Sequence, residues 1–402
     1  MLTTPGTESE RLVKCSKTSF RLHRPVFLAR LYTEILLRQV GLKSQPAVVD
    51  SQLIDVGPLQ RQTVSLNDMT SNPQTAQNTP PRRTLGPNRL SVGPIGLGCM
   101  TMTWAYGSRD RAESIATIRR AVELGVTLFD TADVYGPFTN EELVGEALQD
   151  NRHQIILATK CGLIVPDPKD YHQDASKFSI TPNGRPEHVR KACEDSLRRL
   201  RTNFIDLYQL HRVDSKVPIE ESVGEMAKLV SEGKVRFIGL SECTVEQLER
   251  AQRVHPITSV QSELSLWTRD PLADVLPFCK EHQIGFLPFS PLGRGFLTGD
   301  IERSTSFAKD DFRSILPRFH AEALSTNLRI VEGIKEVASR HQAAPAQIAL
   351  AWVLAQGEQV VPIPGSSKRS HLEQNVEAAM IRLSPEDLAE LDALPAPVGS
   401  RY

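Results

Sequence analysis

The sequence has few of the features that define several large protein classes. Its 402 residues include six cysteines, and none of them shows C-x-x-C spacing, which argues against a zinc site or a disulfide framework. No apolar run approaches the roughly 18 residues needed to span a bilayer. The formal net charge is only -1, which argues against nucleic acid as a principal partner. We therefore expect a cytoplasmic enzyme that uses no metal and binds neither nucleic acid nor membrane.

The sequence also lacks the G-x-G-x-x-G turn that follows a strand in Rossmann nucleotide sites. The glycines of Gly93-Pro-Ile-Gly-Leu-Gly98 come closest, but they lie in the first strand of the regular pattern described below. A doubly wound dinucleotide fold is therefore not indicated.

The first 82 residues differ from the rest. Residues 1–43 hold eight Lys/Arg against three Glu, and residues 69–81 are polar and contain proline. An Arg-rich amphipathic N-terminus can be a mitochondrial presequence. The alternatives are an unstructured extension or upstream sequence that is not translated, with Met69 as the start. We expect residues 1–82 to be an extension and residues 83–402 to form the enzyme domain.

From Arg83 onward the pattern is regular. A hairpin is predicted over 83–92, and the first strand follows at 95–98. Strands and helices then alternate, and eight β-then-α units favour a closed (β/α)8 TIM barrel over an open sheet. The further strands are predicted at 126–131, 155–160, 205–211, 235–240, 259–264, 285–290 and 360–363. The helices are predicted at 111–124, 140–149, 187–200, 219–232, 244–254, 273–282, 326–340, 345–356, 371–379 and 385–394.

Two predicted connections, 162–186 and 292–325, are too long to be plain barrel loops. Both start from the rim at the C-terminal ends of the strands. Their aromatic side chains either wall an apolar pocket or cap the core, and the sequence does not decide between these roles. The aromatic residues in question are Tyr171, Phe178, Phe307, Phe312 and Phe319.

Four polar residues lie at or just past predicted strand ends: Asp130, Tyr135, Lys160 and His211. In a (β/α)8 barrel these ends form one rim, where catalytic groups collect. A carbonyl that accepts hydride develops negative charge on oxygen, so a proton donor must lie beside it. An ammonium such as Lys160 would lower the pKa of a neighbouring phenol, which is ordinarily near 10. The four residues together indicate carbonyl reduction.

Six ordered motifs give the sequence a family resemblance. Over residues 83 to about 394 the chain resembles the aldo-keto reductase superfamily, in particular its microbial and plant branch that includes perakine reductase and pyridoxal reductase-like proteins. The motifs are Phe129-Asp130-Thr131-Ala132-Asp133-Val134-Tyr135-Gly136, Thr159-Lys160, Leu210-His211, Gly239-Leu240-Ser241-Glu242, Ser290-Pro-Leu-Gly-Arg-Gly295 and Ile363-Pro-Gly-Ser366.

The resemblance implies a role for each rim residue. Tyr135 is the general acid, Lys160 and Asp130 tune it, and His211 orients the carbonyl substrate. The implied cofactor is NADP(H), lying across the top of the barrel. Its implied contacts are Ser241, Glu242, Gln261, Ser290, Leu292, Gly293, Arg294, Gly295, Gly365, Ser366, Lys368, Gln374 and Asn375.

The chain departs from the family pattern at the expected 2′-phosphate site. Many relatives have Lys at the position of Gly365 and Arg at the position of His371, and many have Asn at the position of Glu242. Lys368 and Arg369 are the candidates for replacing the missing positive charge. We expect NADPH, with NADH as the alternative.

Two other functions remain open at this point. One is pyridoxal reduction in place of a general aldehyde or ketone. The other is a cofactor-binding regulatory subunit of the potassium-channel β-subunit type, with little turnover. The sequence names neither the substrate nor the oligomeric state.

Overall fold

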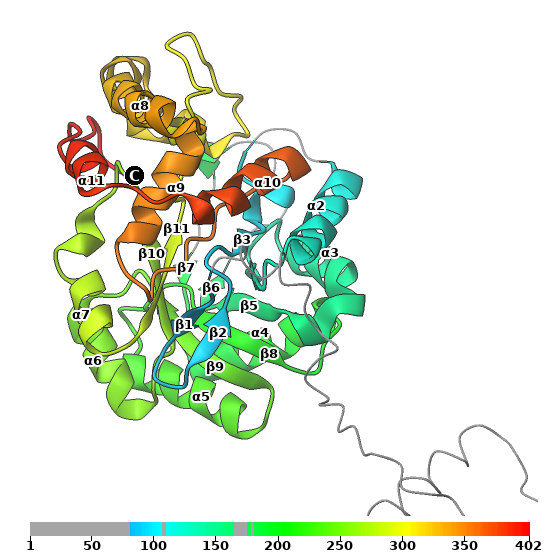
Figure 1. The fold of residues 1–402 in the computed structure, drawn as a ribbon. Helices are drawn as coiled ribbons and strands as arrows, with labels where there is room; N and C mark the ends of the chain where they lie inside the picture. Colours follow the sequence, from blue (N-terminus) through cyan, green and yellow to red (C-terminus); the bar gives the residue numbers. More distant parts are fainter. Residues whose placement is uncertain (1–80, 107–109, 165–174, 178–180) are drawn as a thin grey trace, which may run out of the picture. The chain divides into compact units, whose positions relative to one another are not determined.

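The computed structural model describes residues 81–106, 110–164, 175–177 and 181–402. The predicted extension falls almost wholly outside these ranges, so the domain boundary at residue 83 stays a prediction. Tyr171 and Phe178, from the first long connection, also lie outside them. The described residues form strands at the centre with helices around them (Figure 1).

Seven strands form one sheet in which every neighbouring pair is parallel. Their order is β11-β10-β9-β8-β5-β4-β3, which follows the chain without a reversal, as a barrel requires. The strands are β3 (Leu97–Gly98), β4 (Leu128–Asp130), β5 (Ile156–Cys161), β8 (Ile205–Leu210), β9 (Val235–Ser241), β10 (Ser259–Glu263) and β11 (Gly285–Phe289).

The predicted eighth strand closes the barrel between β11 and β3. The amides of Val361 and Ile363 donate to carbonyls of β11, at 2.8 and 3.0 Å, while the carbonyls of Pro362 and Pro364 accept from Gly96 and Gly98, at 2.9 and 3.1 Å. The segment pairs with its neighbours through the isolated parallel bridges Phe286–Val360 and Gly98–Gly365, not through a continuous ladder. Proline has no N–H to donate. Pro362 and Pro364 face the strand that contains Gly96 and Gly98, where their carbonyls only have to accept. The predicted closed barrel is confirmed.

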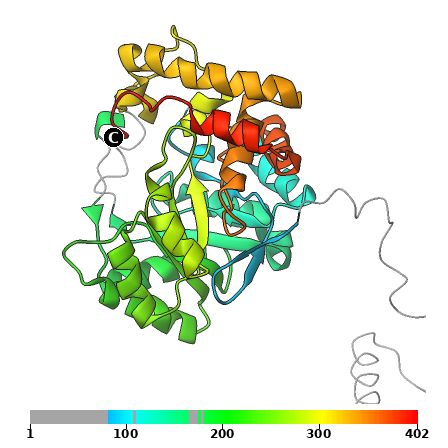
Figure 2. The same cartoon turned by 60° about the vertical axis from the view of Figure 1, so that its left-hand side comes forward.

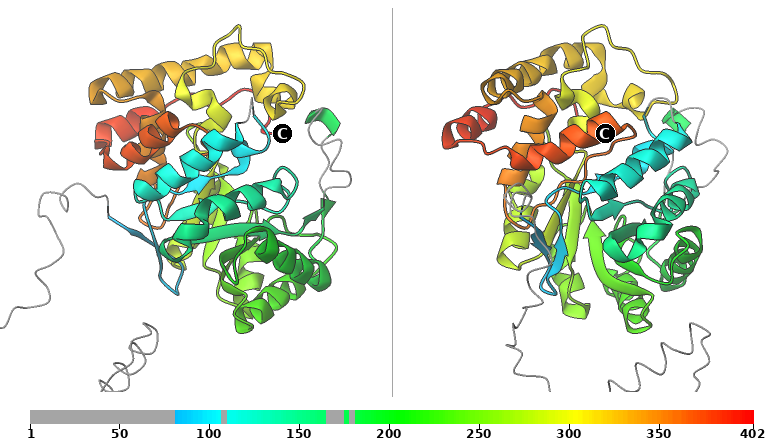
Figure 3. Two further views of the ribbon diagram at one scale, coloured as in Figure 1. Left: turned by 90° about the vertical axis from the view of Figure 1, so that its right-hand side faces the viewer. Right: turned by 45° about the vertical axis from the view of Figure 1, so that its right-hand side comes forward.

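Most of the helices bury one face, whereas residues 348–354 of the helix Pro345–Ala355 are buried at every position. In α4, for example, the buried residues Val189, Ala192, Cys193 and Ser196 follow helical spacing. Views turned from that of Figure 1 show the helices outside the sheet (Figures 2 and 3). The helices are α2 (Arg111–Glu123), α3 (Thr139–Leu148), α4 (Pro186–Arg199), α5 (Ile219–Ser231), α6 (Val245–Val254), α7 (Val275–Glu281), α8 (Ala321–His341), α9 (Pro345–Ala355), α10 (Arg369–Glu377) and α11 (Pro385–Asp392).

Most predicted boundaries agree with the structure to within about two residues. The exception is α8, which begins at Ala321 rather than at 326. Residues 321–325 contain no glycine or proline to stop a helix, so the long loop prediction ran too far. The second long connection is correspondingly shorter and consists mainly of 3-10 turns.

The predicted hairpin is present as β1 (Arg83–Leu85) and β2 (Leu90–Val92), which pair antiparallel. Its Leu85, Leu90 and Val92 are buried in one cluster with side chains of the barrel strands. Arg83 connects the hairpin to the start of the closing segment and the turn before it, because its guanidinium donates to the carbonyls of Val360 and Gly357. A second small pair, β6 (Leu163–Ile164) and β7 (Thr181–Pro182), is also antiparallel.

Candidate active site

The four predicted rim residues meet at the C-terminal ends of neighbouring strands. Asp130 is the last residue of β4, Lys160 is the next-to-last residue of β5, and His211 directly follows β8. All four side chains are buried or nearly so. Asp130, Tyr135 and His211 line a cavity of about 750 Å³. Lys160 lies behind this wall and is inaccessible.

Lys160 connects the acid to the phenol. Its ammonium donates to Asp130 Oδ1 at 2.5 Å, to the Thr131 carbonyl at 2.8 Å and to the Tyr135 hydroxyl at 3.2 Å. An ammonium has three donors, and all three are used. Burial acts to lower the pKa of Lys160, but Asp130 and Tyr135 outweigh it and raise that pKa above its ordinary value. Lys160 is therefore charged at neutral pH.

Asp130 accepts from three side chains. Besides Lys160, its second oxygen accepts from Gln261 Nε2 at 2.8 Å and from Gln209 Nε2 at 3.2 Å. Gln209 and Gln261 come from β8 and β10, so the carboxylate is held from across the barrel interior. This arrangement fixes the orientation of the Asp130–Lys160 pair before any ligand binds.

Tyr135 is positioned by a tight turn after β4. Asn140, at the start of α3, joins the surrounding backbone: it accepts from Thr131 Oγ1 and donates to the Cys99 carbonyl and Thr103 Oγ1. Gly136 has φ +72, and a Cβ there would lie 2.4 Å from Thr139 Oγ1 and 2.6 Å from Thr103 Oγ1. Only glycine fits such a position, which explains the residue that follows the tyrosine.

The pKa of Tyr135 is set by two opposing effects, burial and the neighbouring positive charges. Burial raises it, and this effect exceeds the opposing effects of Lys160 and Arg212, so the pKa lies above its ordinary value. Lys160 lowers the pKa in the predicted direction, but the sequence does not show how deeply the phenol is buried, and burial is the larger effect. The phenol is therefore protonated at neutral pH, as a proton donor must be.

His211 is neutral. Burial lowers its pKa well below the ordinary value, and the positive charges of Lys160 and Arg212 add to this effect. Its ring makes an edge contact with Tyr135, with 5.8 Å between centroids. Its buried Nδ1 has no partner among the described residues.

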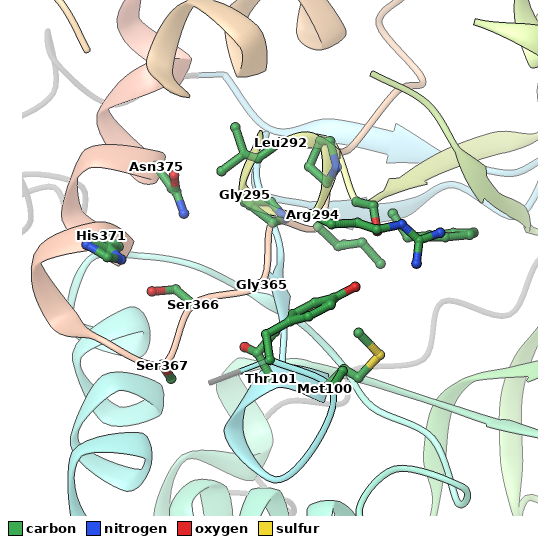
Figure 4. Close-up of a pocket in the computed structure, with 18 of the residues that line it drawn as sticks. Met100, Thr101, Leu292, Arg294, Gly295, Gly365, Ser366, Ser367, His371 and Asn375 are labelled. Carbon is green, nitrogen blue, oxygen red and sulfur yellow. The ribbon is translucent and has the colours of Figure 1, made fainter. Parts of the chain in front are cut away.

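Most of the predicted cofactor contacts lie around the same cavity. Those that line it are Ser241, Gln261, Ser290, Leu292, Arg294, Gly295, Gly365, Ser366, Lys368, Gln374 and Asn375. Figure 4 shows His371 and Asn375 extending from α10 on one side, with Leu292, Arg294 and Gly295 on another. Gly293 and Glu242 do not line the cavity.

The turn after β11 has an unusual backbone. Gly293, Arg294 and Gly295 have φ of +57, +59 and +89, and a Cβ on Gly293 would lie 2.7 Å from Trp267 Nε1. Consecutive positive φ values favour glycine, so the motif Gly-Arg-Gly is required by the chain path. Arg294 lies between the two glycines, and its side chain lines the cavity.

Glu242 is engaged in a partly buried ion-pair cluster. Arg401 donates to Glu242 Oε2 at 2.6 Å and to Glu263 Oε2 at 2.8 Å. Arg294 also donates to Glu263, at 2.9 Å. Burial acts to raise the pKa of Glu263, but the two guanidinium groups outweigh it and lower that pKa. Two carboxylates and two guanidinium groups thus compensate one another, and the predicted cofactor contact of Glu242 stays a prediction.

The two cations considered for the 2′-phosphate differ in placement. Lys368 lines the cavity. Arg369 is paired with Glu113 of α2, with its Nη2 donating at 3.0 Å and its Nε at 3.2 Å. Lys368 is therefore the better placed of the two, and His371 lies on the same cavity wall.

The model of the aldo/keto reductase family matches residues 94–396. The chain belongs to the aldo/keto reductase family. A probable aldo-keto reductase 1 from Glycine max is 47% identical over 326 residues, which cover 79% of this chain and 90% of that protein.

Solved structures of the family have the same fold. A glycerol dehydrogenase from Gluconobacter oxydans matches with a TM-score of 0.70 and 33% identity, covering 77% of this chain and 94% of its own. An aldo/keto reductase from Klebsiella pneumoniae, solved with NADP and acetate, matches with a TM-score of 0.61 and 29% identity over 80% of this chain and 99% of its own. These matches agree with the barrel described above.

The structure adds cavity residues that the sequence did not single out in this aldo/keto reductase. Trp104 follows β3 and stacks on Tyr135, with 6.4 Å between ring centroids. Arg212, Phe289 and Tyr402 also line the cavity. Arg212 carried a signal, since it directly follows His211 at a strand end, whereas Tyr402 comes from the last residue of the chain.

The aromatic residues of the second long connection divide between the two predicted roles. Phe312 lines the cavity. Phe307 and Phe319 contact each other edge to face at 5.4 Å and pack on the core. Among the described residues there is no group of three potential metal ligands and no helix that is long and apolar enough to cross a membrane.

Proposed function

We propose that this aldo/keto reductase reduces an aldehyde or ketone to an alcohol with NADPH, using Tyr135 as the proton donor. One observation carries the proposal: a charged Lys160 is hydrogen-bonded both to Asp130 and to the Tyr135 hydroxyl, and Tyr135 lines the large cavity. A phenol held by a buried cation is suited to giving up a proton and leaving a stabilised phenolate.

The cavity suits an extended cofactor. Its volume of about 750 Å³ is within the range of cofactor sites. Thr101 lines it with a buried hydroxyl that has no partner among the described residues. Lys368, at the N-terminus of α10, supplies positive charge. The Klebsiella pneumoniae relative has been solved with NADP and with NADPH, which supports the same cofactor here. When bound, NADPH supplies the hydride.

The chain's own residues then perform the proton transfer. As the carbonyl oxygen becomes negative, Tyr135 donates its proton to it. Lys160 stabilises the phenolate that remains, and Asp130 keeps Lys160 charged and oriented. The neutral His211 orients the carbonyl beside the phenol. In the oxidative direction the same phenolate accepts the proton from the alcohol.

The test is a turnover assay of the full chain with NADPH against a panel of aldehydes, ketones and pyridoxal. We expect NADPH consumption with formation of the matching alcohol for at least one of them. A clear preference for pyridoxal would assign the narrower reductase function. Tight NADPH binding without turnover on any carbonyl compound would contradict the proposal and favour a regulatory subunit.

A further inference from the structure

The cavity wall beside His211 carries a guanidinium group that is not paired with any carboxylate of the described residues. Arg212 lines the cavity with Tyr135 and His211. Its Nη1 donates to the His211 carbonyl at 2.7 Å and to Ser241 Oγ at 3.3 Å. Both acceptors are uncharged. Among the described residues, nothing accepts from its Nε or Nη2.

Among the described residues, the acids considered as partners of Arg212 are hydrogen-bonded or paired elsewhere. Asp214 is the nearest acid in sequence, and its two oxygens accept from the amides of Gly184 and Lys216 at 3.0 and 2.9 Å. Asp130 is paired with Lys160, and Glu242 and Glu263 are paired with Arg401 and Arg294.

The other cations of the cavity near Tyr135 are compensated. Arg294 is paired with Glu263, and Arg313 donates to both oxygens of Asp311. Arg212 is thus the one arginine of the described cavity lining without an acidic partner. Its two contacts with the His211 carbonyl and Ser241 hold the guanidinium in place, so its remaining donors are oriented before a ligand arrives.

We propose that Arg212 selects carbonyl substrates that carry an anionic group, a carboxylate or a phosphate. This inference rests on the proposed carbonyl reductase function and adds the class of substrate. A planar guanidinium whose Nε and Nη2 have no acceptor among the described residues matches the two oxygens of a carboxylate or phosphate. A partly buried cation without a counter-ion gains most from such a contact, because screening by water is weak there.

The experiment compares substrates that differ in charge but little in shape. The full chain is assayed with NADPH on 4-carboxybenzaldehyde, on its neutral methyl ester and on 4-formylphenyl phosphate. Turnover of the neutral ester tests the reductase function by itself. We expect the wild type to have a higher kcat/KM for the carboxylate or the phosphate than for the ester, and the two anions show which source of charge is preferred.

Arg212→Gln removes the charge and keeps an amide that can donate to the His211 carbonyl. We expect it to lower the ratio of kcat/KM for the preferred anion to that for the ester by about tenfold or more, mainly through KM. Arg313→Gln is the matched control: it changes the cavity charge by the same amount but removes a paired cation, so the ratio should hold.

Two results would overturn the proposal. If Arg212→Gln and Arg313→Gln lower the anion-to-ester ratio of kcat/KM equally, the preference comes from the total positive charge of the cavity and not from a contact with Arg212. If Arg212→Gln weakens NADPH binding and slows reduction of the acid and the ester alike, Arg212 belongs to the cofactor site.

A binding measurement gives a readout without turnover. Benzoate is titrated by calorimetry into the enzyme mixed with NADP⁺, and we expect Arg212→Gln to weaken benzoate binding.

Discussion

The two ends of the cavity differ in how their charges are surrounded. At the reaction end, the side chains of Lys160 and Asp130 are 1% and 4% exposed, and each is hydrogen-bonded on several sides. At the α10 end, Arg369 and Glu113 are 56% and 31% exposed. A buried pair fixes the protonation of its neighbours, whereas an exposed pair is screened by water. Substitutions at the reaction end should therefore act strongly, and substitutions around α10 weakly.

The largest effect is expected from breaking the buried pair. Lys160→Met leaves Asp130 as an uncompensated buried charge, which typically costs about 3–5 kcal/mol of stability. It also removes the cation beside the Tyr135 phenol, so kcat should fall by about 100-fold or more. Denaturant unfolding and steady-state kinetics measure the two losses separately.

A double variant separates stability from catalysis. Asp130→Asn with Lys160→Met removes both charges, and replacing a buried ion pair by uncharged groups is often nearly neutral for stability. We expect most of the lost stability to return while kcat stays low. Recovery of both together would mean that Lys160 serves only the fold.

The raised pKa of Tyr135 predicts opposite pH behaviour for the two reaction directions. Reduction needs the protonated phenol, which persists at neutral pH because burial raises its pKa. Oxidation needs the phenolate, so its kcat should rise by about tenfold per pH unit below that pKa. Rates of alcohol oxidation and carbonyl reduction between about pH 6 and 9 test this, and parallel profiles would contradict the role of Tyr135.

A smaller effect is expected at the α10 end. Lys368→Ala should weaken NADPH binding relative to NADH by about tenfold, the size of one charge-assisted phosphate contact. Arg369→Ala is the control, because Arg369 is paired with Glu113 and should change the ratio little. Fluorescence titration with each cofactor measures the ratio of the NADPH and NADH dissociation constants. A larger effect of Arg369→Ala would place the phosphate on the other side of the α10 N-terminus.

The smallest effect is expected from the N-terminal segment. A chain that begins at Met69 keeps every described residue of the barrel and the cavity. We expect its melting temperature and kcat/KM to match those of the full chain. Loss of solubility or activity in the shorter chain would show that residues 1–68 contribute to the barrel, and that the boundary predicted from composition is misplaced.

The sequence was most informative where a residue's position in the chain determines its position in space. Asp130, Lys160 and His211 lie at the C-terminal ends of predicted strands, and the rim of a parallel barrel brings such ends together. It was less informative where contacts join distant segments. The partner of Arg369 is 256 positions away, and that of Glu242 is 159 positions away. The pKa of Tyr135 depends on burial, which no local pattern reveals.

The central claim is that the Tyr135 hydroxyl donates the proton. Tyr135→Phe keeps the ring against Trp104 and removes only that hydroxyl. The measurement is kcat for carbonyl reduction beside the dissociation constant of NADPH. The account predicts that kcat falls by about 10²–10⁴-fold while NADPH binding is nearly unchanged. Near-normal reduction by Tyr135→Phe would contradict it.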